Sequence, residues 1–133
     1  MEVPIIRFSK WLQDHVLSRE LPADVHGTYT KNATIVVKLD IEGSEYVVLP
    51  DLISSGALCE LDYVFGEFHP YSTPNAFPDS GVDLSTRQKT NTFKNAILSV
   101  ISGLHRTCKV RYEDRDDETY LHDGIPLPTP TKV

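Results

Sequence analysis

The feature that most constrains the fold is a β-branched run, TIVVKL at residues 34–39, which the turn DIEGSE and a helix-like segment follow at once. β-branched residues favour strands, whereas Gly43 and Ser44 suit a turn and a helix N-terminus. The run is almost continuously apolar instead of alternating, which is typical of a strand covered on both faces of a parallel sheet. We therefore expect a central strand in an α/β domain.

The other segments continue an alternation of helices and strands. A helix is predicted over residues 10–20 with Ser9 as its N-cap, and another runs from Glu45 to about residue 55, where Gly56 ends it. Pro50 should kink or divide that helix. A second strand covers residues 61–68, and a long loop covers residues 70–85.

A third helix is predicted up to Leu104, because apolar residues recur there at helical spacing. A closing hairpin over residues 108–113 and 118–122 follows. Strands that alternate with helices imply right-handed crossovers and a parallel sheet, to which the hairpin adds an antiparallel edge strand. The predicted fold class is therefore a three-layer α/β arrangement that is incomplete. The apolar stripe comprises Phe93, Ala96, Ile97, Val100, Ile101 and Leu104.

Composition excludes several classes of protein. The 133 residues amount to one domain, and the net charge of −6 makes duplex nucleic acid an unsuitable partner. No apolar run approaches the roughly 18–20 residues of a membrane helix. The two cysteines, Cys59 and Cys108, allow at most one bridge and form no CxxC pair. We expect them to be small buried hydrophobes and not nucleophiles.

Polar side chains follow both of the first two predicted strands. Asp40 and Glu42 leave the first strand, and Glu67 and His69 leave the second. Ligands of open parallel sheets bind beyond the carboxyl ends of the strands, and neighbouring strands lie about 4.8 Å apart. We therefore expect these four side chains to converge. Each could also serve as an ordinary capping or loop residue, and a metal-dependent hydrolase that uses Asp40, Glu42 and His69 stays open.

The segment from Val36 to Pro70 resembles the FkbM-type methyltransferase family. Its strand ends in K-x-D-x-E-G-x-E, where the chain has Lys38, Asp40, Glu42, Gly43 and Glu45, and the next strand ends in an E-F-H run at residues 67–69. The upstream IIRFSKWLQDHV is also similar to the family's helix before that strand, and the closing YEDRDDETYLHDGIPLP resembles the terminal hairpin of animal-type members. The likeness covers most of the chain.

This resemblance implies the Rossmann-like class I methyltransferase fold, a seven-stranded sheet with one antiparallel strand that binds S-adenosylmethionine. It implies methyl transfer, usually to oxygen, on a small-molecule or glycan-type acceptor. His69 or Asp40 is then the candidate base. Glu42 and Glu67 would shape the acceptor pocket or hold a divalent cation that polarises the acceptor hydroxyl.

One departure from the family pattern is clear: the chain contains no G-x-G. Such a turn lets the backbone approach the cofactor closely. The resemblance therefore implies the C-terminal half of the domain over residues 1–124, with an extended proline-rich tail at 125–133, and binding of S-adenosylmethionine that is weak or absent. The alternative is a non-catalytic binding or interaction module. In either case we expect self-association through the edge of the strand at residues 34–39.

Overall fold

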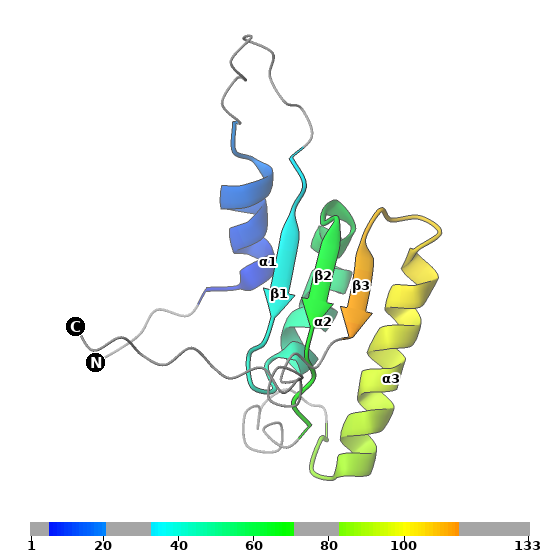
Figure 1. Ribbon diagram of the computed structural model, residues 1–133. Helices are drawn as coiled ribbons and strands as arrows, with labels where there is room; N and C mark the ends of the chain where they lie inside the picture. The colour runs from blue at the N-terminus through cyan, green and yellow to red at the C-terminus, as the bar shows by residue number, and fades with distance from the viewer. Residues whose placement is uncertain (1–5, 21–32, 71–82, 115–133) are drawn as a thin grey trace, which may run out of the picture.

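The computed structural model describes residues 6–20, 33–70 and 83–114, and their helices and strands alternate along the chain (Figure 1). The helical elements are α1 (Phe8–Trp11), the π-helix η1 (Leu12–Leu17), α2 (Glu45–Ser54), the 3-10 helix η2 (Ala57–Glu60) and α3 (Arg87–Leu104). The strands are β1 (Val36–Leu39), β2 (Tyr63–Gly66) and β3 (Arg111–Asp114). None of the helices in this part of the chain is both long and apolar enough to cross a membrane.

The three strands form one parallel sheet in the order β1-β2-β3. Val36 pairs with Tyr63, which pairs with Arg111, and the register continues to Leu39, Gly66 and Asp114. Because α2 connects β1 to β2 and α3 connects β2 to β3, the prediction of an α/β fold with a parallel sheet is confirmed. β3 is the first strand of the predicted hairpin. The second, at 118–122, lies outside the described residues, as do the tail at 125–133 and most of the 70–85 loop.

The described part of the chain has two layers, because its helices all pack against one face of the sheet. That face carries Leu39 and Val64, which are buried in a single core with side chains from α2 and α3. α2 contacts both α1 and α3 (Figure 1). On the opposite face Val36 is 56 % exposed, and Lys38 is exposed as well. The expectation that β1 is covered on both faces is therefore wrong for these residues. In the described sheet β1 is an edge strand, as expected for a half-domain that lacks the neighbouring strand.

Two local predictions also need correction. Ser9 does not cap a helix: α1 begins at Phe8 with Arg7 as its N-cap, and Ser9 is buried and hydrogen-bonds to the Asp51 carboxylate. Pro50 does not divide α2, which continues from Glu45 to Ser54 around it. Proline removes one i to i−4 hydrogen bond, and the packing of the buried Leu49 and Leu52 offsets that loss.

Cys59 and Cys108 are bonded to each other, with their Cα atoms 4.7 Å apart and a sequence separation of 49. The disulfide ties η2 to the segment that leads into β3. Both cysteines are half-buried. The expectation that they are small buried hydrophobes is wrong, because η2 and the end of α3 bring the two sulfur atoms together in the one bridge that two cysteines allow.

Candidate functional site

Three of the four predicted site residues meet at the carboxyl ends of β1 and β2. The Nε2 atom of His69 lies 3.6 Å from Oδ1 of Asp40 and 3.6 Å from Oε1 of Glu67. One ligand atom of each of these three residues lies within 4.8 Å of the other two. Parallel pairing of β1 with β2 causes this convergence, because it brings the ends of both strands to the same edge of the sheet.

A fourth side chain, Glu45, fixes the position of the imidazole. Its carboxylate is fully buried, and Oε1 accepts a hydrogen bond from Nδ1 of His69 at 2.9 Å. The same carboxylate accepts the backbone N–H groups of Ile41 and Gly43, each at 2.8 Å. Glu45 therefore joins the turn after β1 to the segment after β2. We call Asp40, Glu45, Glu67 and His69 the carboxyl-end cluster.

The turn after β1 has the unusual backbone dihedral angles that bring Glu45 into this position. Glu42 has φ of 52° and Gly43 has φ of 98°, and both values lie in the left-handed region. Such values favour glycine and are uncommon for other residues. Ser44 occupies the N-cap position of α2 without making a side-chain cap bond. The Glu45 carboxylate satisfies the N–H groups of the turn instead, so the turn and the histidine depend on one buried side chain.

Glu42, the remaining predicted residue, lies at the margin of this site. It is exposed and does not belong to the group of clustered ligand atoms, but its charge acts on His69. Lys38 also borders the cluster, with its Nζ 3.4 Å from Oδ2 of Asp40. Each charged residue of the K-x-D-x-E-G-x-E motif therefore lies in or beside the cluster.

The surrounding carboxylates raise the pKa of His69. Partial burial lowers it, but the hydrogen bond and the charge of Glu45, together with the charges of Glu42 and Glu67, outweigh burial. A carboxylate can only accept a hydrogen bond, so Nδ1 carries a proton in its contact with Glu45. In the neutral imidazole, Nε2 then presents its lone pair toward Asp40 and Glu67. This arrangement suits the acceptance of a proton or the binding of a cation.

Sequence reasoning missed the site role of Glu45 and two tyrosines whose hydroxyls are buried. Among the residues that the structure describes, the hydroxyls of Tyr46 and Tyr112 have no hydrogen-bond partner. Burial, followed by the charges of Glu45 and Asp114, raises the pKa of Tyr46 to about 12. A Cβ at Gly66 would overlap the Tyr112 hydroxyl, which explains a glycine at the end of a strand. That glycine was the only sequence signal for the close approach.

A small pocket adjoins the cluster at Glu67. It has a volume of about 300 Å³ and is lined by Glu67, Phe68, Lys94 and Asp114. Nζ of Lys94 lies 2.6 Å from Oδ2 of Asp114 and 4.9 Å from the centre of the Phe68 ring. A larger open pocket of about 600 Å³ lies along the first half of α3 and shares no lining residue with the cluster. The smaller pocket is the one within reach of the imidazole.

Comparisons with protein-family models, with curated proteins and with solved structures found no match. The assignment of a function therefore depends on the geometry of the carboxyl-end cluster and on the motif whose residues form it.

Proposed function

We propose that this chain contributes the acceptor-binding part of an S-adenosylmethionine-dependent methyltransferase domain of the FkbM type, in which the fold is the C-terminal half of a Rossmann-like sheet. One observation carries the proposal: the imidazole of His69, held by buried Glu45, lies at the carboxyl ends of two adjacent parallel strands. Ligand sites of open α/β sheets lie at that edge. The motif K-x-D-x-E-G-x-E supports the same proposal, because it builds the turn that holds the imidazole.

In the proposed reaction, the oxygen of an acceptor hydroxyl attacks the methyl carbon of S-adenosylmethionine. The new O–CH₃ bond forms as the S–CH₃ bond breaks, and S-adenosylhomocysteine leaves. Nε2 of His69 accepts the proton of the hydroxyl, and Glu45 stabilises the resulting imidazolium through Nδ1–H. Partial burial lowers the pKa of His69, but the hydrogen bond and the charges of the carboxylates around it raise that pKa above the ordinary value of 6.5, which favours acceptance of a proton.

The acceptor would lie in the pocket beside Glu67, where Lys94 and Phe68 offer a cation and an aromatic surface. Such a lining suits a small polyhydroxylated or glycan-type acceptor. The sequence has no G-x-G turn, so we expect the purified chain to bind S-adenosylmethionine weakly or not at all by itself.

The test measures transfer of a labelled methyl group from S-adenosylmethionine to hydroxyl-bearing small molecules and glycans. The assay contains the chain and a polypeptide that supplies the glycine-rich half of a related methyltransferase. His69→Ala and Asp40→Asn should lower turnover by about 10²–10⁴-fold, the usual contribution of general acid–base groups. His105→Ala, at an exposed histidine beyond the end of α3, is the matched control and should keep full turnover.

Near-normal turnover of both cluster variants would contradict the proposed roles, and thermal melts of the same samples would separate lost chemistry from lost folding. Saturable binding of S-adenosylmethionine by the chain alone at micromolar concentration, about −8 kcal/mol, would contradict the half-domain part of the proposal.

A non-catalytic interaction module is the second candidate, and the exposure of β1 favours it. Within the described sheet β1 has a neighbour on one side only, and Val36 is 56 % exposed there. An unprotected edge strand can pair with a strand of another chain. Absence of methyl transfer under every condition above, together with such pairing, would favour this candidate.

A further inference from the structure

Two of the three distances between the donor atoms of Asp40, Glu67 and His69 are close to those between metal ligands, and all three atoms lie within 4.8 Å of one another. The two distances of 3.6 Å from Nε2 of His69 to Asp40 and Glu67 are longer than a hydrogen bond. They are close to the separation of about 3.4 Å between two donors that bind one zinc ion tetrahedrally at about 2.1 Å. One imidazole with two carboxylates is also a donor set that first-row transition metals accept.

The support of the imidazole is a second feature of a metal site. Metal-binding histidines usually donate their other ring N–H to a carboxylate or a carbonyl, which fixes the tautomer and the ring orientation. His69 has this arrangement, because Nδ1 is hydrogen-bonded to Glu45, whose side chain is fully buried. Backbone N–H groups of Ile41 and Gly43 fix Glu45 in turn. The ring is therefore oriented before any ion arrives.

The site is accessible and negatively charged. Asp40 is 40 % exposed, whereas Glu67 and His69 are mostly buried, at 13 % and 19 %. An ion could therefore enter from the side of Asp40 and keep an open coordination position there. Nζ of Lys38 lies 3.4 Å from Oδ2 of Asp40. The second oxygen of that carboxylate, Oδ1, faces the imidazole.

We propose that Oδ1 of Asp40, Oε1 of Glu67 and Nε2 of His69 bind one divalent transition-metal ion, with zinc as the best fit. Glu45 is the positioning residue of this site, since it holds the ring and does not touch the ion. The remaining coordination positions belong to water or to an oxygen of the acceptor.

The metal site would change one step of the proposed function, because His69 would then hold the ion and would no longer act as the base. This consequence rests on the proposed function, whereas metal binding does not. An ion at Nε2 occupies the lone pair that would otherwise accept the acceptor's proton. A bound ion would polarise the acceptor hydroxyl and lower its pKa, and solvent water would then take the proton. Metal binding itself requires neither S-adenosylmethionine nor an acceptor.

The test is a calorimetric titration of the complete, chelator-treated chain with zinc chloride, repeated with cobalt(II) to record the ligand-field absorption. We expect one ion per chain. Asp40→Asn and Glu67→Gln should each weaken binding at least tenfold, and Glu45→Gln should weaken it by about 10–100-fold, as other supporting carboxylates do. Glu60→Gln and His105→Ala, at exposed residues outside the cluster, are matched controls that should bind zinc normally.

Nuclear magnetic resonance of the ¹⁵N-labelled chain gives a readout that requires no variant. Zinc should shift the Nε2 resonance of His69 and leave Nδ1 protonated. Absence of saturable one-to-one binding would overturn the proposal, as would an equal loss of affinity in the control variants. Because these measurements contain no methyl donor, they can fail while methyl transfer persists, and the reverse also holds.

Discussion

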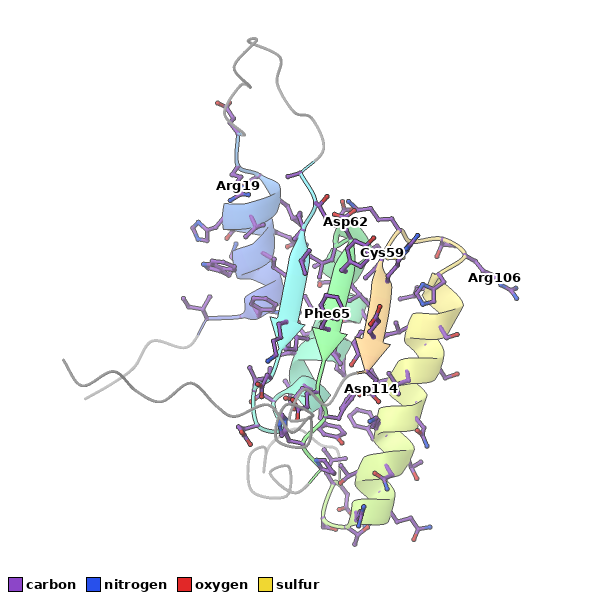
Figure 2. All side chains as sticks on the ribbon, in the orientation of Figure 1. Arg19, Cys59, Asp62, Phe65, Arg106 and Asp114 are labelled. Carbon is purple, nitrogen blue, oxygen red and sulfur yellow. A yellow bond between two sulfur atoms is a disulfide. The ribbon has the colours of Figure 1, made fainter. Side chains whose placement is uncertain are left out.

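The two ends of the small sheet differ in the contacts that their charged side chains make. At the amino end, the Asp62 carboxylate accepts the N–H of Ile35 at 2.8 Å and pairs with Nζ of Lys109 at 3.2 Å. The disulfide of Cys59 and Cys108 lies beside this pair, and Figure 2 shows Cys59 and Asp62 at the end where the strands begin. This end joins segments that are far apart in the chain, and its carboxylate has a lysine partner.

At the carboxyl end, three carboxylates surround one imidazole, and one of them, Asp40, also has a lysine partner in Lys38. Asp40, Glu45 and Glu67 all lie within 3.6 Å of a nitrogen atom of His69. Such an arrangement concentrates negative charge in one place, and a proton or a metal ion bound there can neutralise part of it. The comparison indicates that the amino end stabilises the fold, whereas the carboxyl end has the arrangement for which we propose a chemical role. The following predictions separate the two ends.

The largest expected effect is at the amino end. Replacing both Cys59 and Cys108 with serine should lower the free energy of unfolding by about 4 kcal/mol, because the bridge closes a loop of 49 residues in the unfolded chain. Denaturant unfolding without reductant measures this loss, and reduction of the unmodified chain should reproduce it.

Zinc affinity of the refolded double variant should be unchanged, since the disulfide lies at the other end of the sheet. Two free thiols in the native chain, or a loss of stability below about 1 kcal/mol, would contradict a stabilising bridge at the amino end.

The second effect is at the carboxyl end. Glu45→Gln places an amide N–H₂ where a buried carboxylate now accepts three hydrogen bonds, from Ile41, Gly43 and His69. We expect a loss of about 2–3 kcal/mol of unfolding free energy, since hydrogen bonds to buried charged groups are strong. Glu60→Gln, at an exposed carboxylate in η2, should change stability by less than about 0.5 kcal/mol. Equal melting temperatures of the two variants would show that the Glu45 carboxylate does not stabilise the turn after β1 and the imidazole.

The third prediction concerns the edge of the sheet between the two ends. We expect the chain to associate with itself at high concentration through β1, because this strand is unpaired on one side of the described sheet. Val36→Lys should reduce that association and change stability little, since Val36 is mostly exposed. Ser99→Lys, which adds the same charge at an exposed position of α3, is the control. Light scattering over a concentration series measures this association. A chain that stays monomeric at every concentration contradicts the prediction.

Much of this fold could be predicted from the sequence, because residue patterns within single segments determine where most of its helices, strands and turns lie. The β-branched run, Gly43 and Gly56 locate β1, its turn and the end of α2, and Gly56 has the expected left-handed φ of 75°. The convergence of Asp40, Glu67 and His69 also followed, since parallel strand ends share one edge.

The errors concern contacts between distant segments. No local sequence pattern reveals that Cys59 forms a disulfide with Cys108. Nor does one reveal that Ser9 hydrogen-bonds to Asp51 instead of capping a helix. The sequence places Glu45 in the motif and at the start of a helix, but it does not reveal the contact with His69, which lies 24 residues away. Apolar continuity predicted a covered strand, but continuity measures composition and not the number of layers packed against a sheet.

The smallest expected effect returns to the amino end and depends on pH. The hydrogen bond from Ile35 lowers the pKa of Asp62, burial opposes it, and Lys109 lowers the pKa further. A carboxyl whose pKa is depressed in the folded state binds protons more tightly when unfolded, so its stabilising contribution is present above the unfolded value of about 3.9. That contribution is lost as the pH falls through the lower folded value.

Asp62→Asn should therefore be less stable than the unmodified chain at neutral pH, and the difference should shrink as the pH falls below about 4. Asparagine can still accept the N–H of Ile35, so the variant removes the charge and keeps the hydrogen bond. Lys109→Gln, which removes only the ion pair, should show part of the same pH dependence and serves as the matched control. Unfolding by denaturant at a series of pH values measures the difference. If that difference stays constant between neutral pH and pH 3, the charge of Asp62 does not stabilise the amino end, and the contrast between the two ends then depends on the disulfide alone.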